Sequence, residues 1–310
     1  MTEPIRIAQL SDTHFLEDGA APEGGHAYDT DAAFEAVLSH LGDHAYLDLI
    51  AVTGDVADHG RAEQYRKATA AFSRLQAPVN ACPGNHDFDA AFTANMGRTG
   101  VNTSRVVEIG NWAFLFVDSN AGVMQTDESG LPIDPPGEQR LHINGVLGRR
   151  EAAWVRSMCA ATTADHVFIW LHHPPEVPIP MCHDASYAAE WRALLGDLPI
   201  IKGLGGGHTH IPAEYELLGR PVFVAPSFKN NFALEEQTWL PPGYRTYEFD
   251  PDGSIRSEVL VDDEQWPRVP YGRALKSLFM GELTFQGTRR DFGSSGQPVA
   301  LSPSNPSSWP

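Results

Sequence analysis

The amino-acid sequence predicts a layered α/β fold with its sheet inside the molecule. Two observations support this prediction. Short apolar runs recur between residues 5 and 204, and segments with helical spacing of apolar residues lie between them. Such alternation is typical of helices packed on a buried sheet. At 310 residues the chain is long enough to bury a full core.

Six runs are predicted to be interior strands, because each is short and apolar and ends at polar residues, glycine or proline. They are residues 5–10, 47–52, 78–82, 112–117, 167–171 and 199–204. Four segments place apolar residues on one face of a helix, namely 30–41, 61–75, 149–160 and 186–195. In the first of these helices, Phe34, Val37, Leu38 and Leu41 follow the i, i+3, i+4, i+7 spacing.

The pattern changes beyond residue 220, where we predict antiparallel strands at 221–226, 244–250 and 254–261. Residues 1–265 are expected to form one domain. Residues 266–310 are expected to be an extension that covers a site or forms a homodimer interface. Loops of the length of 119–148 and 174–185 are usually functional or irregular.

The chain is acidic, with 40 Asp and Glu against 22 Lys and Arg and a formal net charge of −18. This balance argues against nucleic acid or an anionic membrane surface as a partner. The three cysteines, Cys82, Cys159 and Cys182, have no CxxC spacing, so we expect no disulfide framework and a cytoplasmic protein. The N-terminus does not resemble a signal peptide, and no apolar run approaches the ~20 residues that span a bilayer.

Residues that can bind metals follow five of the predicted strands. The clusters are SDTH after 5–10, TGDVAD after 47–52, PGNHD after 78–82, HHPP after 167–171 and GGGHTH after 199–204. Ligands bind at the carboxyl ends of strands in α/β sheets, and Asp, Asn and His offer oxygen and nitrogen to Mn, Fe or Zn. Any one cluster could be an ordinary turn, but five at equivalent positions indicate a metal site.

The segment GGGHTH separates His208 from His210 by one residue. On an extended segment, residues i and i+2 point to the same side, so the two rings are expected to reach two neighbouring metal ions. The glycines would let the backbone approach the site without a Cβ clash.

In order, D-x-H, G-D-x-x-D, G-N-H-D, His before Pro-Pro and G-H-x-H resemble the calcineurin-like metallophosphoesterase superfamily. The resemblance implies a four-layer α-β-β-α sandwich of two mixed sheets flanked by helices, with two metal ions at the strand ends. One ion would be bound by Asp12, His14, Asp55 and His210, and the other by Asp55, Asn85, His172 and His208. Mn²⁺ is the expected metal, with Fe or Zn as alternatives, and His173 is the alternative to His172.

The resemblance also implies catalytic roles outside the ligand set. His86 would face the substrate as a general acid or as a charged stabiliser, and Asp58 would hydrogen-bond it. The alternative for Asp58 is a helix cap or loop carboxylate. Asp87 is interpreted as a cap of the following helix. A hydroxide bridging the metals would attack phosphorus, so no Ser or Cys nucleophile is needed.

The expected substrate is a small phosphodiester. G-D-x-x-D and G-N-H-D lack the Arg neighbours typical of protein phosphatases, whereas GNHD, LHHPP and residues 241–255 resemble bacterial class III cyclic-nucleotide phosphodiesterases and their glycerophosphodiesterase relatives. The expected reaction converts 3′,5′-cyclic AMP to 5′-AMP. Few Lys or Arg flank the motifs, which favours a diester over a monoester. The alternatives are a glycerophosphodiesterase, a phosphomonoesterase or nucleotide pyrophosphatase, and a non-catalytic metal-stabilised scaffold. His183 is interpreted as an ordinary loop residue.

Overall fold

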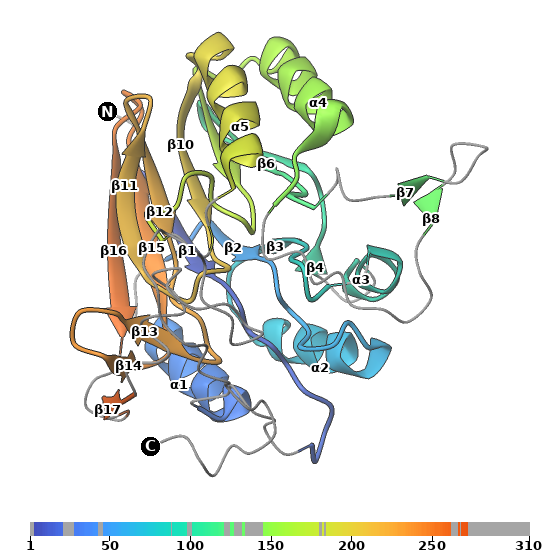
Figure 1. Ribbon diagram of the computed structural model, residues 1–310, viewed down its shortest axis with the longest axis vertical. Helices are drawn as coiled ribbons and strands as arrows, with labels where there is room; N and C mark the ends of the chain where they lie inside the picture. The colour runs from blue at the N-terminus through green and yellow to red at the C-terminus, as the bar shows by residue number, and fades with distance from the viewer. Residues whose placement is uncertain are drawn as a thin grey trace, which may run out of the picture.

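The computed structural model places two six-stranded sheets face to face, with helices on their outer faces (Figure 1). The residues that it describes are 3–20, 28–42, 46–87, 89–97, 101–120, 125–126, 132–133, 145–179, 182, 184–261, 266 and 268–271.

The first sheet has the strand order β16-β15-β1-β2-β3-β4. Its strands are β1 (Ile5–Leu10), β2 (Leu49–Thr53), β3 (Val79–Cys82), β4 (Val101–Asn102), β15 (Gly243–Phe249) and β16 (Ile255–Val261). Strands β1 to β4 are parallel, and β15 pairs antiparallel with β1, with Ile7 opposite Tyr247. The parallel strands are mostly apolar because both of their faces are covered.

The second sheet has the order β11-β12-β10-β9-β6-β5. Its strands are β5 (Val106–Ile109), β6 (Trp112–Phe116), β9 (His166–Trp170), β10 (Ile201–Gly206), β11 (Ala213–Leu217) and β12 (Arg220–Val224). The four central strands are parallel, and β5 and β11 are antiparallel edges. The prediction that residues 221–226 form an antiparallel strand is therefore only half right, because β12 is parallel to β10 and antiparallel to β11.

Helices cover the outer face of each sheet. Helices α1 (Thr30–Gly42), α2 (Ala62–Phe72) and α3 (Asp89–Met96) share an apolar cluster with the first sheet, and α4 (Gly148–Ala161) and α5 (Ala185–Asp197) share one with the second. In Figure 1, α4 and α5 lie on one side of the molecule and α1 and α2 on the other. A third cluster, rich in aromatic rings such as Phe114, Phe168 and Trp170, fills the space between the sheets. The predicted four-layer sandwich is confirmed.

Two smaller sheets complete the described residues. Strands β13 (Asn231–Ala233), β14 (Thr238–Leu240) and β17 (Val269–Pro270) form one, and β7 (Gln125–Thr126) and β8 (Pro132–Ile133) form the other. The second of these sheets lies in the loop 119–148, most of which is outside the described residues. Residues 272–310 of the predicted extension are also outside them. No helix of the described residues is both long and apolar enough to cross a membrane.

Candidate metal centre

The carboxyl ends of β1, β2 and β3 in the first sheet meet those of β9 and β10 in the second. Within the first sheet, the backbone N–H of Asp12 donates to the carbonyl oxygen of Gly54 at 3.0 Å. Between the sheets, the side-chain amide of Gln9 donates to the carbonyl oxygen of Gly206 at 2.9 Å. The two sheets are thus joined where the predicted ligands begin.

Four groups of three His or Asp side chains have ligand atoms within 4.8 Å of one another. They are Asp12–His14–His210, Asp12–Asp55–His172, His14–Asp55–His86 and His172–His173–His208. Asp12, His14, Asp55 and His172 each belong to two of the groups, so the groups form one continuous cluster. His210 lies with Asp12 and His14, whereas His208 lies with His172. Asn85 joins them, because its Oδ1 is 3.1 Å from Nε2 of His172. The clusters are consistent with a dimetal centre.

Hydrogen bonds fix which ring nitrogen of three histidines faces the centre. The Nδ1–H of His172 donates to the carbonyl oxygen of Thr53 at 2.9 Å. The Nδ1–H of His14 donates to Oδ1 of Asp58 at 2.8 Å, and that of His210 to Oδ1 of Asn230. Since a carbonyl or carboxylate oxygen can only accept, each Nδ1 carries the proton. Each Nε2 therefore faces the centre, and in the neutral ring it offers a lone pair, which is the usual arrangement for a metal-binding histidine.

Ring nitrogens and carboxylate oxygens converge on one side of the centre. Nε2 of His14 is 3.4 Å from Nε2 of His210 and 3.6 Å from Oδ2 of Asp55. Nε2 of His210 is also 3.1 Å from Oδ1 of Asp12. Burial, and next the charge of Lys229, lower the pKa of His14 to about 3, so this ring is neutral at pH 7. A cation between these atoms would replace lone-pair repulsion with attraction, so the donor set fits a metal ion.

The two buried carboxylates of the centre are ionised. Burial alone would raise the pKa of Asp12 and of Asp55, but neighbouring histidines outweigh it and hold both pKa values below their usual range. His210 is the largest such influence on Asp12, and His172 on Asp55. Burial opposes the charged form of His172, yet Asp55 and then Asp12 raise its pKa to about 9. The negative field at this point thus favours a cation, whether a proton or a metal ion.

Five of the predicted ligands adopt left-handed backbone conformations. The φ angles are 52° at Asp12, 43° at His14, 49° at Asp55, 68° at His208 and 53° at His210. Non-glycine residues rarely adopt this region, and such strain clusters at functional sites. The prediction of an extended GGGHTH segment is wrong, because both histidines lie in bends after β10. These bends, and not strand periodicity, direct the two rings to different groups.

Two glycines allow the loops to approach one another. A Cβ on Gly84 would lie 2.2 Å from Oδ1 of Asp55, and one on Gly207 would lie 2.3 Å from Oδ2 of Asp12. The backbone N–H of His208 donates to both carboxylate oxygens of Asp12, at 3.1 and 3.0 Å. The expected role of the glycine run as a close-approach segment therefore holds at Gly207.

Asp58 contacts His86 differently from the expectation. Nδ1 of His86 donates to the backbone carbonyl oxygen of Asp58 at 2.7 Å. The Asp58 carboxylate accepts from Nδ1 of His14 and, at 2.7 Å, from Nζ of Lys229. The backbone carbonyl of Asp58, and not its carboxylate, therefore fixes the proton on Nδ1 of His86 and leaves Nε2 to exchange a proton. The backbone N–H of His86 donates to Oδ1 of Asp55 at 2.8 Å, which holds the ring beside the metal groups.

Asp87 has contacts that its interpretation as a helix cap did not include. Its buried carboxylate accepts from the backbone N–H groups of Val56, Ala57 and Gly84, at 3.1, 3.2 and 2.9 Å. It also accepts from the hydroxyl of Tyr65 at 3.0 Å. Burial, and then the charge of nearby Asp55, raise the pKa of Asp87 to about 6. Asp87 thus ties the loop after β2 to the loop after β3.

The structure bears on the choice between His172 and His173. Nε2 of His172 lies 3.2 Å from Oδ2 of Asp55, in addition to its contact with Asn85. Nδ1 of His173 instead contacts the hydroxyl of Ser119 at 2.8 Å. This geometry favours His172 as the ligand, although His173 lies in one group with His172 and His208. His183 lies outside the described residues.

Sequence reasoning missed Lys229 and Asn230, which follow β12 at the same edge. The rule that identified the other residues could have found them, because SFKNN also follows a strand end. Its residues are not the Asp and His of a ligand pattern, so they gave no metal signal. Lys229 contacts Asp58, which in turn orients His14, and Asn230 contacts the ring of His210 directly.

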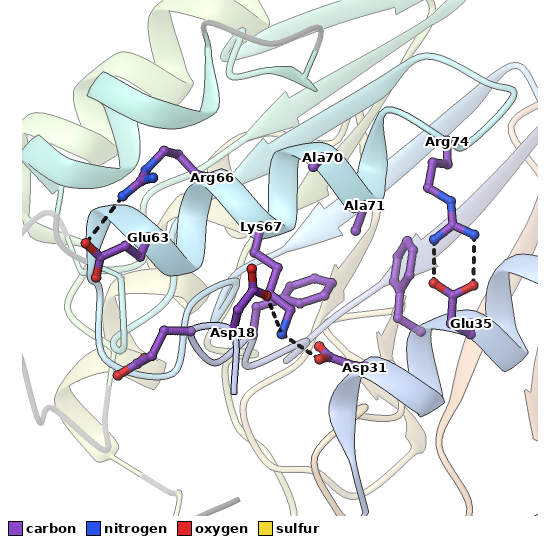
Figure 2. A pocket seen from close by; sticks show the side chains of 12 residues that line it. Asp18, Asp31, Glu35, Glu63, Arg66, Lys67, Ala70, Ala71 and Arg74 are labelled. Atoms are coloured by element: carbon purple, nitrogen blue, oxygen red, sulfur yellow. Dashed lines mark hydrogen bonds and ion pairs between the residues drawn. The ribbon is translucent and has the colours of Figure 1, made fainter. Parts of the chain in front are cut away.

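A groove of about 770 Å³ lies away from these groups, between α1 and α2 (Figure 2). None of the predicted metal ligands lines it. Each of its three basic side chains is paired with carboxylates, since Arg74 pairs with Glu35, Arg66 with Glu63, and Lys67 with Asp18 and Asp31. The groove therefore has no bearing on the metal centre.

Residues 5–212 match the family described as calcineurin-like phosphoesterase. The 3′,5′-cyclic adenosine monophosphate phosphodiesterase CpdA of Escherichia coli (strain K12) is 29% identical over 269 residues, 82% of this chain and 89% of the relative. The glycerophosphodiester phosphodiesterase GpdQ of Enterobacter lignolyticus (strain SCF1) is 26% identical over 217 residues, 66% and 70% of the two chains. A solved dimetal phosphatase from Danio rerio shares the fold, with a TM-score of 0.55 at 14% identity over 84% of this chain and 99% of that one.

The fold and the His/Asp groups define a metal-dependent phosphoesterase with a binuclear type of site. The chain belongs to the calcineurin-like phosphoesterase family, as the sequence resemblance predicted. It is a hydrolase of phosphoric esters, and its substrate is a small phosphoester.

Proposed function

We propose that this chain is a binuclear phosphodiesterase that hydrolyses 3′,5′-cyclic nucleotides, with cyclic AMP giving 5′-AMP. The convergence of Asp12, Asp55 and the histidines from five strand ends supports the metal centre. The likeness to a cyclic AMP phosphodiesterase over 82% of the chain supports the substrate.

The proposed ligands are those that the resemblance implies. Asp12, His14, Asp55 and His210 would hold one ion, and Asp55, Asn85, His172 and His208 the other. Two bound ions would supply positive charge for the phosphate oxygens and activate water as the nucleophile. This charge is needed because the chain itself is strongly acidic. Mn²⁺ is the proposed metal, with Fe or Zn as alternatives.

His86 is the proposed general acid. Its Nδ1–H is engaged by the carbonyl oxygen of Asp58, so Nε2 is the nitrogen that would donate the transferred proton, from the imidazolium form of the ring. As water adds to phosphorus, the bond from phosphorus to the 3′-oxygen breaks, and that oxygen takes the Nε2 proton. Asp58 acts as the positioning residue for both His86 and His14.

A linear glycerophosphodiester is the second candidate substrate, since a named glycerophosphodiester phosphodiesterase is 26% identical over 66% of this chain. The argument against a monoester is weaker than the sequence suggested. Lys229 brings a cation to within 2.7 Å of Asp58, beside the centre, from a segment outside the motifs. A phosphomonoesterase therefore remains an outcome that the assay must test.

The test is turnover of 3′,5′-cyclic AMP, a glycerophosphodiester and 5′-AMP by protein stripped of metal and reloaded with Mn²⁺. His86→Ala is expected to lower kcat on the cyclic diester by about 10²–10⁴-fold with two metals still bound. His166→Ala is the matched control. His166 begins β9, at the opposite end from His172, and its Nε2 bonds to the carbonyl of Pro251 at 3.0 Å.

Three results would contradict parts of the proposal. Turnover of only the linear diester or the monoester would contradict the proposed substrate but not the proposed metal centre. Equal losses in His86→Ala and His166→Ala would remove the catalytic role of His86. No turnover by a protein that binds two metals would favour a non-catalytic scaffold.

Two further proposals follow from the sequence. We place the protein in the cytoplasm, a proposal supported by three cysteines without a disulfide, two of them buried. A homodimer remains the proposed assembly, to be tested by sedimentation.

A further inference from the structure

We propose that the loop of residues 225–230, between β12 and β13, sets the affinity of one of the two metal positions. That position is the one formed by Asp12, His14 and His210. Lys229 and Asn230 are its positioning residues. The inference rests on the proposed binuclear centre, but it is independent of which ester is the substrate. We call residues 225–230 the support loop.

The support loop holds the backbone of Asp12. The hydroxyl of Ser227 and the backbone N–H of Phe228 both donate to the carbonyl oxygen of Asp12, each at 3.1 Å. Ser11 and Ser227 form an isolated parallel bridge. Since Asp12 has a left-handed φ of 52°, its unusual backbone is held by these contacts from the second sheet.

The support loop reaches His14 through Asp58. Nζ of Lys229 and Nδ1 of His14 both donate to the same oxygen of Asp58, Oδ1, at 2.7 and 2.8 Å. The side chains of Lys229 and Asp58 are only 14% and 5% exposed. A buried carboxylate is costly without a countercharge, so Lys229 stabilises the ionised acceptor that orients His14.

The support loop orients His210 directly. The amide oxygen of Asn230, a residue 6% exposed, accepts the Nδ1–H of His210. Just beyond the loop, the backbone N–H of Phe232 donates to the carbonyl oxygen of His210 at 2.8 Å. Both the ring and the main chain of His210 are therefore held from this side.

The orienting contacts of the other position come from a different part of the fold. The ring of His172 is fixed by the carbonyl oxygen of Thr53, on β2. Asn85 lies on the loop that Asp87 ties to the end of β2. The support loop thus orients residues of one position and not His172 or Asn85 of the other, although the positions share Asp55 and the backbone N–H of His208 donates to Asp12. Loss of an orienting partner typically lowers metal affinity by about 10–100-fold.

The test is a calorimetric titration of metal-free protein with Mn²⁺, with bound metal counted by elemental analysis. The variants are Lys229→Met, Lys229→Arg and Asn230→Ala. We expect wild-type protein to bind two ions. Asn230→Ala and Lys229→Met should weaken one ion by about 10–100-fold and leave the other unchanged, and Lys229→Arg should recover part of the loss.

Two comparisons identify which ion is affected. Asn85→Ala removes an amide ligand from the other position, so it should weaken the ion that Asn230→Ala leaves intact. The double variant should then weaken both. Lys202→Met is the control for charge, because Lys202 lies on β10 at the end away from His208, with Nζ near the carbonyl of Pro199. It should bind both ions as wild type does.

Thermal melts of the metal-free variants separate misfolding from loss of metal. If Lys229→Met does not fold, Asn230→Ala and Lys229→Arg still decide the question. The inference is overturned if the support-loop variants bind both ions with wild-type affinity, if both ions weaken equally, or if Asn230→Ala and Asn85→Ala weaken the same ion. If wild-type protein does not bind two ions, the proposed binuclear centre is overturned, and this inference with it.

Discussion

Replacing Asp87 with alanine should destabilise the fold more than replacing a surface carboxylate with alanine would. The Asp87 side chain is 1% exposed and accepts four hydrogen bonds, three from backbone N–H groups and one from the hydroxyl of Tyr65. These bonds hold together the loops that carry Asp55 and His86. Asp87→Ala leaves all four donors without their acceptor.

The expected loss is about 3 kcal/mol of unfolding free energy. A buried donor without a partner costs about 1–3 kcal/mol, so the simple sum over four donors exceeds the expected loss of about 3 kcal/mol. Two effects reduce it. Water can enter the space left by the carboxylate, and the substitution removes a charge that is itself unfavourable, as the raised pKa of Asp87 shows. A loss of this size is a large part of the ~5–15 kcal/mol that stabilises a typical protein.

The assay is urea unfolding of metal-free protein at pH 7.5, so that metal binding does not add to the measured free energy. Asp197→Ala is the matched control, because the Asp197 side chain is 64% exposed and pairs only at the surface with Arg156. It should change stability by less than about 1 kcal/mol. Asp87→Asn, which keeps the shape and one acceptor oxygen, should fall between the two.

The reasoning is refuted if Asp87→Ala loses no more stability than Asp197→Ala. It is also refuted if Asp87→Ala is strongly destabilised but Asp87→Asn is equally so, because lost packing and not lost acceptors would then explain both. A loss of metal affinity without a loss of stability would mean that Asp87 acts only on the ligands.

Three further results are expected. Gly84→Ala should abolish binding of both metal ions that Asp55 is proposed to share, because the added Cβ would lie 2.2 Å from Oδ1 of Asp55. Elemental analysis measures the bound metal, and a normal metal content would contradict this prediction. Burial raises the pKa of Cys159 to about 11 and of Cys182 to about 12, against 9.0 for a free thiol. Because only the thiolate reacts, iodoacetamide at pH 8 should label both at least about 100-fold more slowly in native than in unfolded protein, with native labelling increasing as pH rises towards 11; equal rates would refute the burial argument. Phe168→Ala, in the core between the sheets, should lower the unfolding free energy by about 3–5 kcal/mol in urea, and a loss below 1 kcal/mol would show that the sheets pack less tightly there than described.

The parallel strands were predictable because they are buried on both faces. Residues 5–10 appear as β1 with the same bounds, and 199–204 appears two residues later as β10. The antiparallel pairing of residues 244–250 with 254–261 was also predictable, from the turn between them. Helix α3 was expected only as the helix that follows Asp87, because its eight residues, DAAFTANM, are too few to repeat the i, i+4 pair of Phe92 and Met96.

The sequence by itself determined the class of site. Asp, Asn and His after five apolar runs predict that the side chains meet, because the carboxyl ends of parallel strands lie at one edge of a sheet. This local rule needs no knowledge of how the two sheets are stacked. It was sufficient to find every residue of the four His/Asp groups.

Only the tertiary structure decided which atoms support those residues. The carbonyl of Asp58, not its carboxylate, holds His86, and the carboxylate of Asp87 ties two loops together. Lys229 contacts Asp58 across 171 residues of the chain, and Asn230 contacts His210 across 20. Neither contact follows from spacing or composition, because packing of one sheet on the other brings Lys229 to Asp58, and the pairing of β10 with β12 brings Asn230 to His210. The types of ligand residue can therefore be predicted from the sequence, whereas the orientation of each ligand depends on contacts that form only in the folded structure.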